Sequence, residues 1–205
     1  MSPGWVVVVP VKPLGMAKSR LVRSDRAALA LAMATDTVAA ARAAGAEVVV
    51  VTDDPHAAAV LAGPGVRVVA DEPDAGLNPA VAHGAAVATA RWPDRGVAAL
   101  AADLPALQAE ELRRALSAAA AHERALVADA AGTGTVLLTA RPGAALRPSF
   151  GRVSRAAHVA AGARDLTDDL GAGVAGLRRD VDTLEDLRTA LVLGVGPATW
   201  RLIGR

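Results

Sequence analysis

Short apolar runs of strand length alternate with Ala- and Leu-rich segments of helical length along most of the chain. The first run, WVVVV at residues 5–9, is followed by a long alanine-rich segment that ends at Gly45, and similar pairs of segments recur further on. Apolar runs without polar alternation are typical of strands that are buried on both faces, and helical segments between them provide crossover connections. The pattern predicts an α/β fold, in which a mixed, mostly parallel sheet has helices on both faces.

Strands are expected at Trp5 to Val9, Glu47 to Thr52, Val66 to Ala70, Val97 to Ala102, Ala125 to Asp129, Thr135 to Thr139 and Leu177 to Val181. Helices are expected at Arg26 to Ala44, Pro79 to Arg91, Glu110 to Ala121 and Leu184 to Leu193. The strands near 125 and 135 are separated by a Gly/Thr turn that is too short for a crossover helix, which predicts an antiparallel excursion at one edge of the sheet. No linker or internal repeat interrupts the pattern, so residues 1–205 are expected to form a single domain.

Composition excludes several classes of protein. The 205 residues suit one domain, and 53% hydrophobic residues with only 2% aromatics predict a core of Ala, Val and Leu. The 22 Lys and Arg residues nearly balance the 21 Asp and Glu residues, so the protein has no overall electric field that would attract nucleic acid or a membrane surface. Without cysteine there is no disulfide or thiolate metal site, and no apolar stretch reaches the roughly 20 residues of a membrane span. We expect a soluble, cytoplasmic protein and leave its oligomeric state open.

The loop after the first strand, PVKPLGMAKSRL at residues 10–21, holds both lysines of an otherwise arginine-rich chain. Ligands of open α/β sheets bind beyond the carboxyl ends of the strands, where this loop is expected. Lys12, Lys18 and Arg20 supply positive charge, and Gly15 allows close approach of the backbone, as a polyphosphate requires. The loop is neither a Walker A sequence nor GxGxxG. A solvated basic loop is the alternative, and we favour phosphate binding.

Carboxylates follow two other predicted strands. Asp103 comes directly after the fourth, in ALAAD, and Asp180 and Asp182 lie at the end of the last, on one face if that strand persists so far. Aspartates from different strand ends can converge on Mg²⁺, which prefers oxygen ligands. The sequence from Thr183 to Asp186 resembles a capping box, so one acid there could serve only the helix that follows. Asp103 has no such alternative role.

Three further sites have both a structural and a binding interpretation. Asn78, the only asparagine, is either the N-cap of a helix or a contact to a nucleotide. Thr135 in GTGT offers a hydroxyl beside exposed amides, in a turn that a hairpin would also need. Gly151 and Ser154 in SFGRVS form an anion cradle or an ordinary helix start with Ser154 as cap. The four histidines lack ligand spacing, and no chemistry is assigned to them.

In their order along nearly the whole chain, PVK…AKSRL, GLN, ADLPAL, GTGT, FGxxS and DVDTxEDL resemble the guanylyltransferases of deazaflavin coenzyme (coenzyme F-420) biosynthesis, which act on phosphoenolpyruvate or 2-phospho-L-lactate. DLP and DxDTxEDL are shared with other nucleotidyltransferases of the glycosyltransferase-A-like fold. PVKxxxxAKSRL together with FGxxS narrows the resemblance to this family. The glycine-rich GGxSxRMG opening of the sugar and molybdopterin branches is absent.

The resemblance implies that the phosphate of a small phosphorylated three-carbon acid attacks the α-phosphorus of GTP and that pyrophosphate leaves. A phosphate is already ionised at neutral pH, so the reaction needs positioning and charge neutralisation by Mg²⁺ and cations, and no general base. The resemblance assigns Lys12, Lys18 and Asp103 to catalysis, Lys12, Gly15, Lys18, Arg20, Gly76 and Asn78 to the nucleotide, Thr135, Gly151 and Ser154 to the acceptor, and Asp103, Asp180 and Asp182 to the metal.

Two other functions stay open from the sequence. The first is nucleotidyl transfer to another acceptor, a sugar phosphate or molybdopterin. The second is a non-catalytic GTP-binding regulator, although the loss of strand-end acids that would mark one is not seen. Between the two acceptors of the family we expect phosphoenolpyruvate, because the Ala/Arg-rich, lysine-poor composition resembles that of actinobacterial proteins, whose branch is associated with that acceptor.

Overall fold

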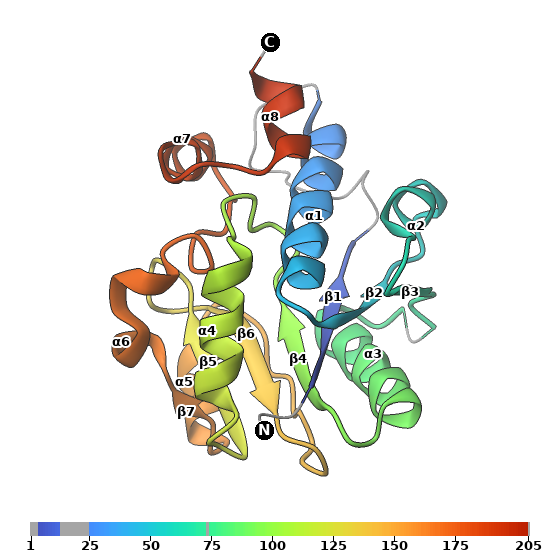
Figure 1. The fold of residues 1–205 in the computed structure, drawn as a ribbon, viewed down its shortest axis with the longest axis vertical. Coiled ribbons are helices and arrows are strands. Elements are labelled where there is room, and N and C mark those ends of the chain that lie inside the picture. The colour runs from blue at the N-terminus through green and yellow to red at the C-terminus, as the bar shows by residue number, and fades with distance from the viewer. Residues whose placement is uncertain (1–3, 13–24, 73, 205) are drawn as a thin grey trace.

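A computed structural model describes residues 4–12, 25–72 and 74–204 of the chain. Its described strands form one mixed sheet in the order β3-β2-β1-β4-β6-β5-β7 (Figure 1). The strands are β1 (Trp5–Pro10), β2 (Glu47–Val51), β3 (Val66–Val69), β4 (Gly96–Leu100), β5 (Arg124–Ala128), β6 (Thr135–Ala140) and β7 (Arg164–Asp165). β1 pairs in parallel with β2 and β4, and β6 pairs antiparallel with β4 and β5. The predicted mixed, mostly parallel sheet is confirmed.

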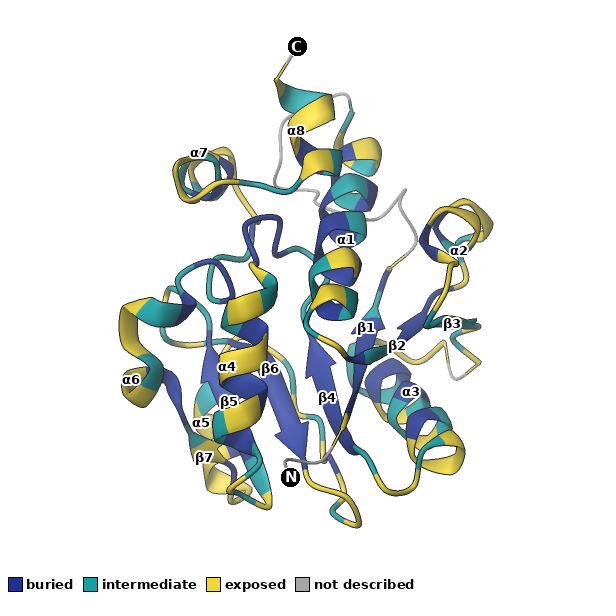
Figure 2. Cartoon of the chain, in the orientation of Figure 1, coloured by how far each residue is buried: buried dark blue, intermediate teal, exposed yellow. Residues whose placement is uncertain are grey.

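Helices cover both faces of this sheet. They are α1 (Arg26–Ala43), α2 (Pro55–Leu61), α3 (Leu77–Arg91), α4 (Ala109–Ala119), α5 (Ser154–Ala160), α6 (Thr167–Leu170), the 3-10 helix η2 (Gly171–Val174), α7 (Leu184–Leu193) and α8 (Pro197–Ile203). Alternate valines of β1 enter two different apolar clusters. Val7 and Val9 pack with residues of α1, α2 and α4, whereas Val6 and Val8 pack with residues of α3. The strands β1, β2, β4, β5 and β6 are therefore buried on both sides, as their unbroken apolar runs predict, whereas the edge strand β3 is only partly buried (Figure 2).

The antiparallel strand, which was expected at one edge of the sheet, lies inside it. β6 is inserted between β4 and β5, and the short β7, which was not predicted, adds in parallel to β5 at the edge. The hairpin between β5 and β6 follows from the short Gly/Thr turn. β7 has only two residues, too few for a periodic signal in the sequence.

The expected strand from Leu177 to Val181 is wrong. The segment instead follows η2 as turns and irregular chain, so Asp180 and Asp182 do not share a strand face. Its backbone amides bond to groups outside the sheet: those of Gly176 and Leu177 donate to the carboxylate of Glu111 on α4, at 2.9 and 3.0 Å. The apolar pattern that suggested a strand comes from Leu177 and Val181. Their buried side chains anchor residues 176–182, the crossing segment, to the core.

Gly176 permits the close approach of this segment to α4. A Cβ atom there would lie 2.2 Å from the carbonyl oxygen of Ala106 and 2.6 Å from the carboxylate of Glu111. The Glu111 carboxylate also accepts from the Gln108 amide as part of the capping box of α4. One side chain thus caps a helix and holds a loop.

The described C-terminal helices pack against α1. A third cluster contains Leu29 and Met33 of α1, Ala106 of the loop after β4, Val181 of the segment before α7 and Leu187 of α7, with Leu202 and Ile203 of α8 packed on it. The buried carboxylate of Asp36 accepts from the first amides of α8, Ala198 and Thr199, at 2.9 and 2.8 Å. Among the helices of the described ranges, none is long and apolar enough to cross a membrane.

We expect Glu111→Ala to lower the free energy of unfolding by about 1–3 kcal/mol, because the partly buried amides of Gly176 and Leu177 lose a charged acceptor. Glu110→Ala is the matched control, since that exposed glutamate pairs only with Arg113 on the helix surface and should change stability by no more than about 0.5 kcal/mol. Urea unfolding of both variants provides the comparison. Equal losses for the two would contradict the anchoring role of Glu111.

Candidate active site

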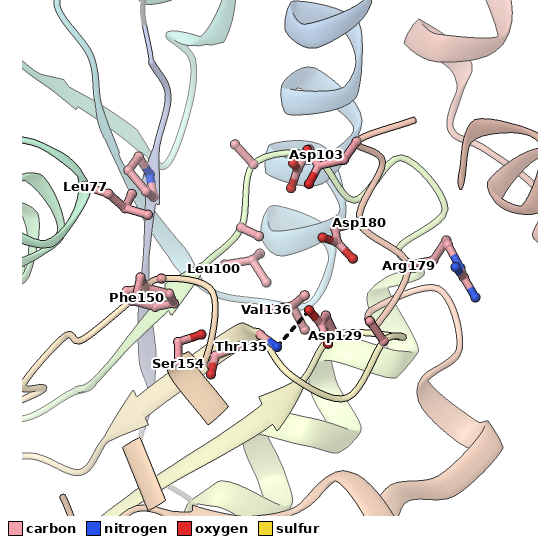
Figure 3. Close-up of a pocket in the computed structure, with 18 of the residues that line it drawn as sticks. Leu77, Leu100, Asp103, Asp129, Thr135, Val136, Phe150, Ser154, Arg179 and Asp180 are labelled. Carbon is pink, nitrogen blue, oxygen red and sulfur yellow. Dashed lines mark hydrogen bonds between the residues drawn. The ribbon is translucent and has the colours of Figure 1, made fainter. Parts of the chain in front are cut away.

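A cavity of about 990 Å³ lies at the carboxyl edge of the parallel strands, where β1, β4 and β5 end and β6 begins. Its polar lining residues include Lys12, Asp103, Asp129, Thr133, Thr135, Arg152, Ser154, Arg179, Asp180, Asp182, Thr183 and Asp186. Figure 3 shows Asp103, Asp180 and Asp129 one after another along one side, with Phe150 and Ser154 across from them. The cavity thus has an acidic side and a side of hydroxyl and aromatic groups.

Asp103 follows β4 and is held by its neighbours in the chain. The hydroxyl of Thr37 on α1 lies 3.2 Å from the carbonyl oxygen of Ala102 and accepts from the amide of Leu104 at 3.2 Å. The carbonyl of Asp103 itself accepts from the amide of Val181 at 3.1 Å. These bonds fix the backbone on both sides of the carboxylate and bring the crossing segment next to it.

Asp180 and Asp182 therefore reach the cavity from an irregular segment on either side of Val181. The helix that follows is capped by Thr183, whose hydroxyl accepts from the Asp186 amide, while the Asp186 carboxylate accepts from the Thr183 amide. The predicted capping box is confirmed, and Asp186 is its acid. Asp182 is one of the cavity-lining acids and not the acid of this cap.

Asp129 is a site residue that the sequence analysis did not select. It follows β5, and its carboxylate accepts from the amides of Thr133 and Gly134 at 3.0 and 2.9 Å, which shapes the turn of the hairpin. A Cβ atom on Gly134 would lie 2.3 Å from that carboxylate, so a larger residue there would displace the carboxylate from its two amide partners. Arg178 donates to the carbonyls of Ala128 and Asp129 and ties the crossing segment to this strand end. The signal was the same as for Asp103, an aspartate directly after an apolar strand.

The acids of the cavity repel one another. Burial raises the pKa of Asp180 to about 7, with further contributions from the negative charges of Asp103, Asp129 and Asp182. Among the described residues, no three acidic, histidine or cysteine side chains are close enough to form a ready metal site. The two findings agree physically, because charges interact over several ångströms whereas ligands must lie about 2 Å from a metal ion. Several carboxylate oxygens that line one cavity fit a hard divalent cation.

The side across from the acids holds the three residues assigned to the acceptor. Thr135 begins β6, Gly151 lies in the loop before α5, and Ser154 is the first residue of that helix. Ser154 does not cap α5, whose N-cap is Val153, so that part of the prediction is wrong. The cap geometry fails because the buried Ser154 already lies inside the first turn, which leaves its side chain at the cavity.

Asn78 is not an N-cap either. α3 begins at Leu77 with Gly76 before it, at φ 100°, a conformation that favours glycine. Within the first turn, the Asn78 side chain donates to the carbonyl of Phe150 at 3.0 Å and accepts from its amide at 2.6 Å. Asn78 therefore fastens the loop before α5, and neither it nor Gly76 is among the residues that line the cavity.

The predicted cationic loop is described only in part. Lys12 is exposed at the end of β1 and lines the cavity, as expected for a group that meets an anion there. Gly15, Lys18 and Arg20 lie outside the described residues. Arg152 and Arg179, which the sequence analysis did not assign to the site, also line the cavity.

The fold is similar to that of solved nucleotidyltransferase structures. A nucleotidyl transferase from Methanothermobacter thermautotroptrophicus superposes with a TM-score of 0.62 at 22% identity, over 93% of this chain and 97% of that one. A Mycobacterium tuberculosis protein in complex with manganese superposes with a TM-score of 0.56 at 26% identity, over 94% of this chain and 100% of that one. The first of these likenesses shows the fold alone.

The sequence identifies the family within this class. Residues 5–202 match the family described as guanylyl transferase CofC like. A phosphoenolpyruvate guanylyltransferase of Thermomonospora curvata is 58% identical over 206 residues, which cover 98% of this chain and 89% of that protein. A protein of the same name from Streptomyces coelicolor is 56% identical, over 98% of this chain and 96% of its own length. The chain belongs to the CofC-like guanylyltransferase family, and the resemblance drawn from its motifs is confirmed.

We expect Asp180→Asn to raise the melting temperature of the metal-free protein above pH 7 and to leave it nearly unchanged near pH 4. The folded-state pKa of Asp180 is about 7, above its ordinary 3.8, so the stability that accompanies the protonated form is complete below pH 3.8 and is lost as the pH rises through 7. Asparagine does not ionise. Each kcal/mol recovered should raise the melting temperature by about 2–4 °C in a chain of this size.

Thermal unfolding from pH 4 to pH 8 in the presence of a chelator measures this difference. Asp94→Asn is the matched control, an exposed aspartate beside the start of β4, at the end of the sheet opposite the cavity. A gain for Asp180→Asn that is the same at pH 4 and pH 8 would contradict the raised pKa.

Proposed function

We propose that this protein transfers GMP from GTP to phosphoenolpyruvate and releases pyrophosphate. The observation that carries the proposal is the two-sided cavity: four mutually repelling aspartates face a side of hydroxyl groups, at the strand ends where ligands of α/β sheets bind. Guanylyl transfer needs both sides, one to neutralise a triphosphate through a cation and one to hold an acidic acceptor. The relatives at 56–58% identity that carry the name phosphoenolpyruvate guanylyltransferase support this substrate.

In the proposed reaction, a phosphate oxygen of phosphoenolpyruvate attacks the α-phosphorus of GTP. A bond forms between that oxygen and the α-phosphorus, the bond from the α-phosphorus to the bridging oxygen breaks, and pyrophosphate leaves with the electron pair. The nucleophile is ionised at neutral pH, so no side chain needs to remove a proton. The work of the protein is to align the two phosphates and to offset their charge.

The residues divide this work. Lys12, which lines the cavity just after β1, would meet phosphate oxygens there. Lys18 and Arg20 share this role in the sequence prediction and lie outside the described residues. Thr135, Ser154 and the Gly151 amide would bind the carboxylate end of the acceptor. Asp103, Asp180 and Asp182 would hold Mg²⁺, and a bound cation supplies positive charge that stabilises the transferring phosphate. The manganese complex of the M. tuberculosis protein supports a divalent cation in this fold.

Nucleotide contacts by Gly76 and Asn78 are not part of the proposal for the described conformation. The Asn78 amide has both of its polar atoms on the Phe150 backbone, so its expected role shifts from binding a nucleotide to holding the loop of the acceptor side. A cytoplasmic location stays a prediction from the sequence, as does the single domain over residues 1–205.

Purified protein with GTP, Mg²⁺ and phosphoenolpyruvate is expected to release one pyrophosphate for each guanylylated acceptor. Parallel reactions with 2-phospho-L-lactate and with a sugar 1-phosphate test the alternatives. We expect kcat/KM to be highest for phosphoenolpyruvate, although the acceptors of the family differ only by a planar or tetrahedral carbon, a difference worth about 1–3 kcal/mol in a pocket. GTP binding without pyrophosphate release for any acceptor would contradict the proposal and favour a regulatory GTP-binding protein.

In the same assay, Asp103→Asn should lower kcat by about a hundredfold or more, because charge stabilisation by a bound cation is worth several kcal/mol. Asp94→Asn, remote from the cavity, provides the control and should leave kcat unchanged. Normal turnover of a folded Asp103→Asn protein would remove Asp103 from the metal site.

A further inference from the structure

His158 on α5 lies directly behind the side of the cavity assigned to the acceptor. It is buried, with 1% of its surface exposed, and its two ring nitrogens have different partners. Nδ1 lies 3.0 Å from the hydroxyl oxygen of Thr135 on β6, and Nε2 lies 2.9 Å from the amide nitrogen of Ser149 in the loop before α5. The ring therefore joins the strand that carries one acceptor-binding residue to the loop that leads to the others.

The partners determine where the ring carries its proton. The Ser149 amide can only donate, so Nε2 must be the unprotonated nitrogen that accepts from it. Burial lowers the pKa of His158 and keeps the ring neutral, so its one proton resides on Nδ1. Nδ1 then donates to the Thr135 oxygen, and the Thr135 hydroxyl retains its own proton for another acceptor. Thr135 lines the cavity, where that acceptor would be an oxygen of the substrate.

Phe150, the next residue of the same loop, is also held in place. The ring of Phe150 packs edge to face against the imidazole of His158, with centroids 5.0 Å apart and planes at 74°. The backbone of Phe150 is hydrogen-bonded to the side chain of Asn78. Figure 3 shows Phe150, Ser154 and Thr135 together at this side of the cavity. Ser149 and Phe150 precede Gly151 directly, so the position of the loop determines where the Gly151 amide lies.

We propose that His158 is a positioning residue for the acceptor: as a neutral imidazole protonated on Nδ1, it fixes the loop at Ser149 and directs the Thr135 hydroxyl proton into the cavity. This inference rests on the proposed function for the identity of the acceptor. His158 does not touch the substrate, and it acts through Thr135 and the loop. The aspartates and Lys12 are not among its hydrogen-bond partners, so its loss should affect acceptor binding and leave GTP binding intact.

Three substitutions separate the two contacts. In His158→Asn, the amide nitrogen can occupy the position of Nδ1 and donate to Thr135, but the side chain does not reach Ser149. In His158→Gln, the amide oxygen can occupy the position of Nε2 and accept from Ser149, but the donor to Thr135 is lost. His158→Ala loses both contacts. His122→Asn is the control, because that histidine follows α4 at the opposite end of β5 from the cavity.

Steady-state kinetics should show that His158→Ala raises KM for phosphoenolpyruvate about tenfold or more while KM for GTP changes less than about twofold. The Asn and Gln variants should lie between wild type and Ala, and His122→Asn should match wild type. A parallel rise in both KM values, or Asn and Gln variants no better than Ala, would overturn the proposal.

Nitrogen-15 NMR of the wild-type imidazole tests the tautomer without any turnover. The expected spectrum has a protonated Nδ1 and an unprotonated Nε2 for His158 at neutral pH. A protonated Nε2, or a charged ring, would overturn the proposal even in an active enzyme. Failure of wild-type protein to use phosphoenolpyruvate would instead refute the proposed function and leave the tautomer result standing.

Discussion

The site depends on how one irregular segment, residues 176–182, satisfies its backbone hydrogen bonds. Its amides do not enter the sheet: those of Gly176 and Leu177 bind Glu111 of α4, and that of Val181 binds the Asp103 carbonyl. Because buried amides must be paired, these partners fix the path of the segment across the ends of the strands. Asp180 and Asp182 are thereby held beside the acid that follows β4. The proposed metal-binding set, which is drawn from separate elements, depends on these hydrogen bonds.

Ionising Asp180 in the cavity costs stability. Its pKa is raised to about 7, first by burial and then by the negative charges of Asp103, Asp129 and Asp182. A cation and a triphosphate that arrive together would reverse this balance. The opposite side of the cavity is held by directed hydrogen bonds. His158 and Asn78 accept from the loop amides of Ser149 and Phe150, and His158 also bonds the Thr135 hydroxyl. The acidic side is arranged to bind a cation, and the opposite side to hold an acceptor of defined shape.

The sequence predicted the features that depend on periodicity and missed those that depend on tertiary contacts. The long strands and helices were expected within a few residues, because unbroken valine runs and alanine-rich segments carry clear signals. Leu177 and Val181 imitated a strand, since burial as loop anchors gives the same apolar pattern. Asp129 follows an apolar strand, as Asp103 does, but the sequence analysis did not select it. His158 could not be found, because its partners, Thr135 and Ser149, lie 23 and 9 residues away along the chain and only the fold brings them together.

In the proposed enzyme, Asp103, Asp180 and Asp182 would hold a divalent cation against the phosphates of GTP. The most direct test of this assignment is a crystal structure with Mn²⁺ and a non-hydrolysable GTP analogue, with anomalous diffraction recorded at the manganese edge, since Mn²⁺ accepts the same oxygen ligands as Mg²⁺. We expect an anomalous peak about 2.0–2.3 Å from carboxylate oxygens of Asp103 and of Asp180 or Asp182, and in contact with nucleotide phosphate. Nucleotide bound in the cavity with manganese elsewhere, or with none, would contradict it.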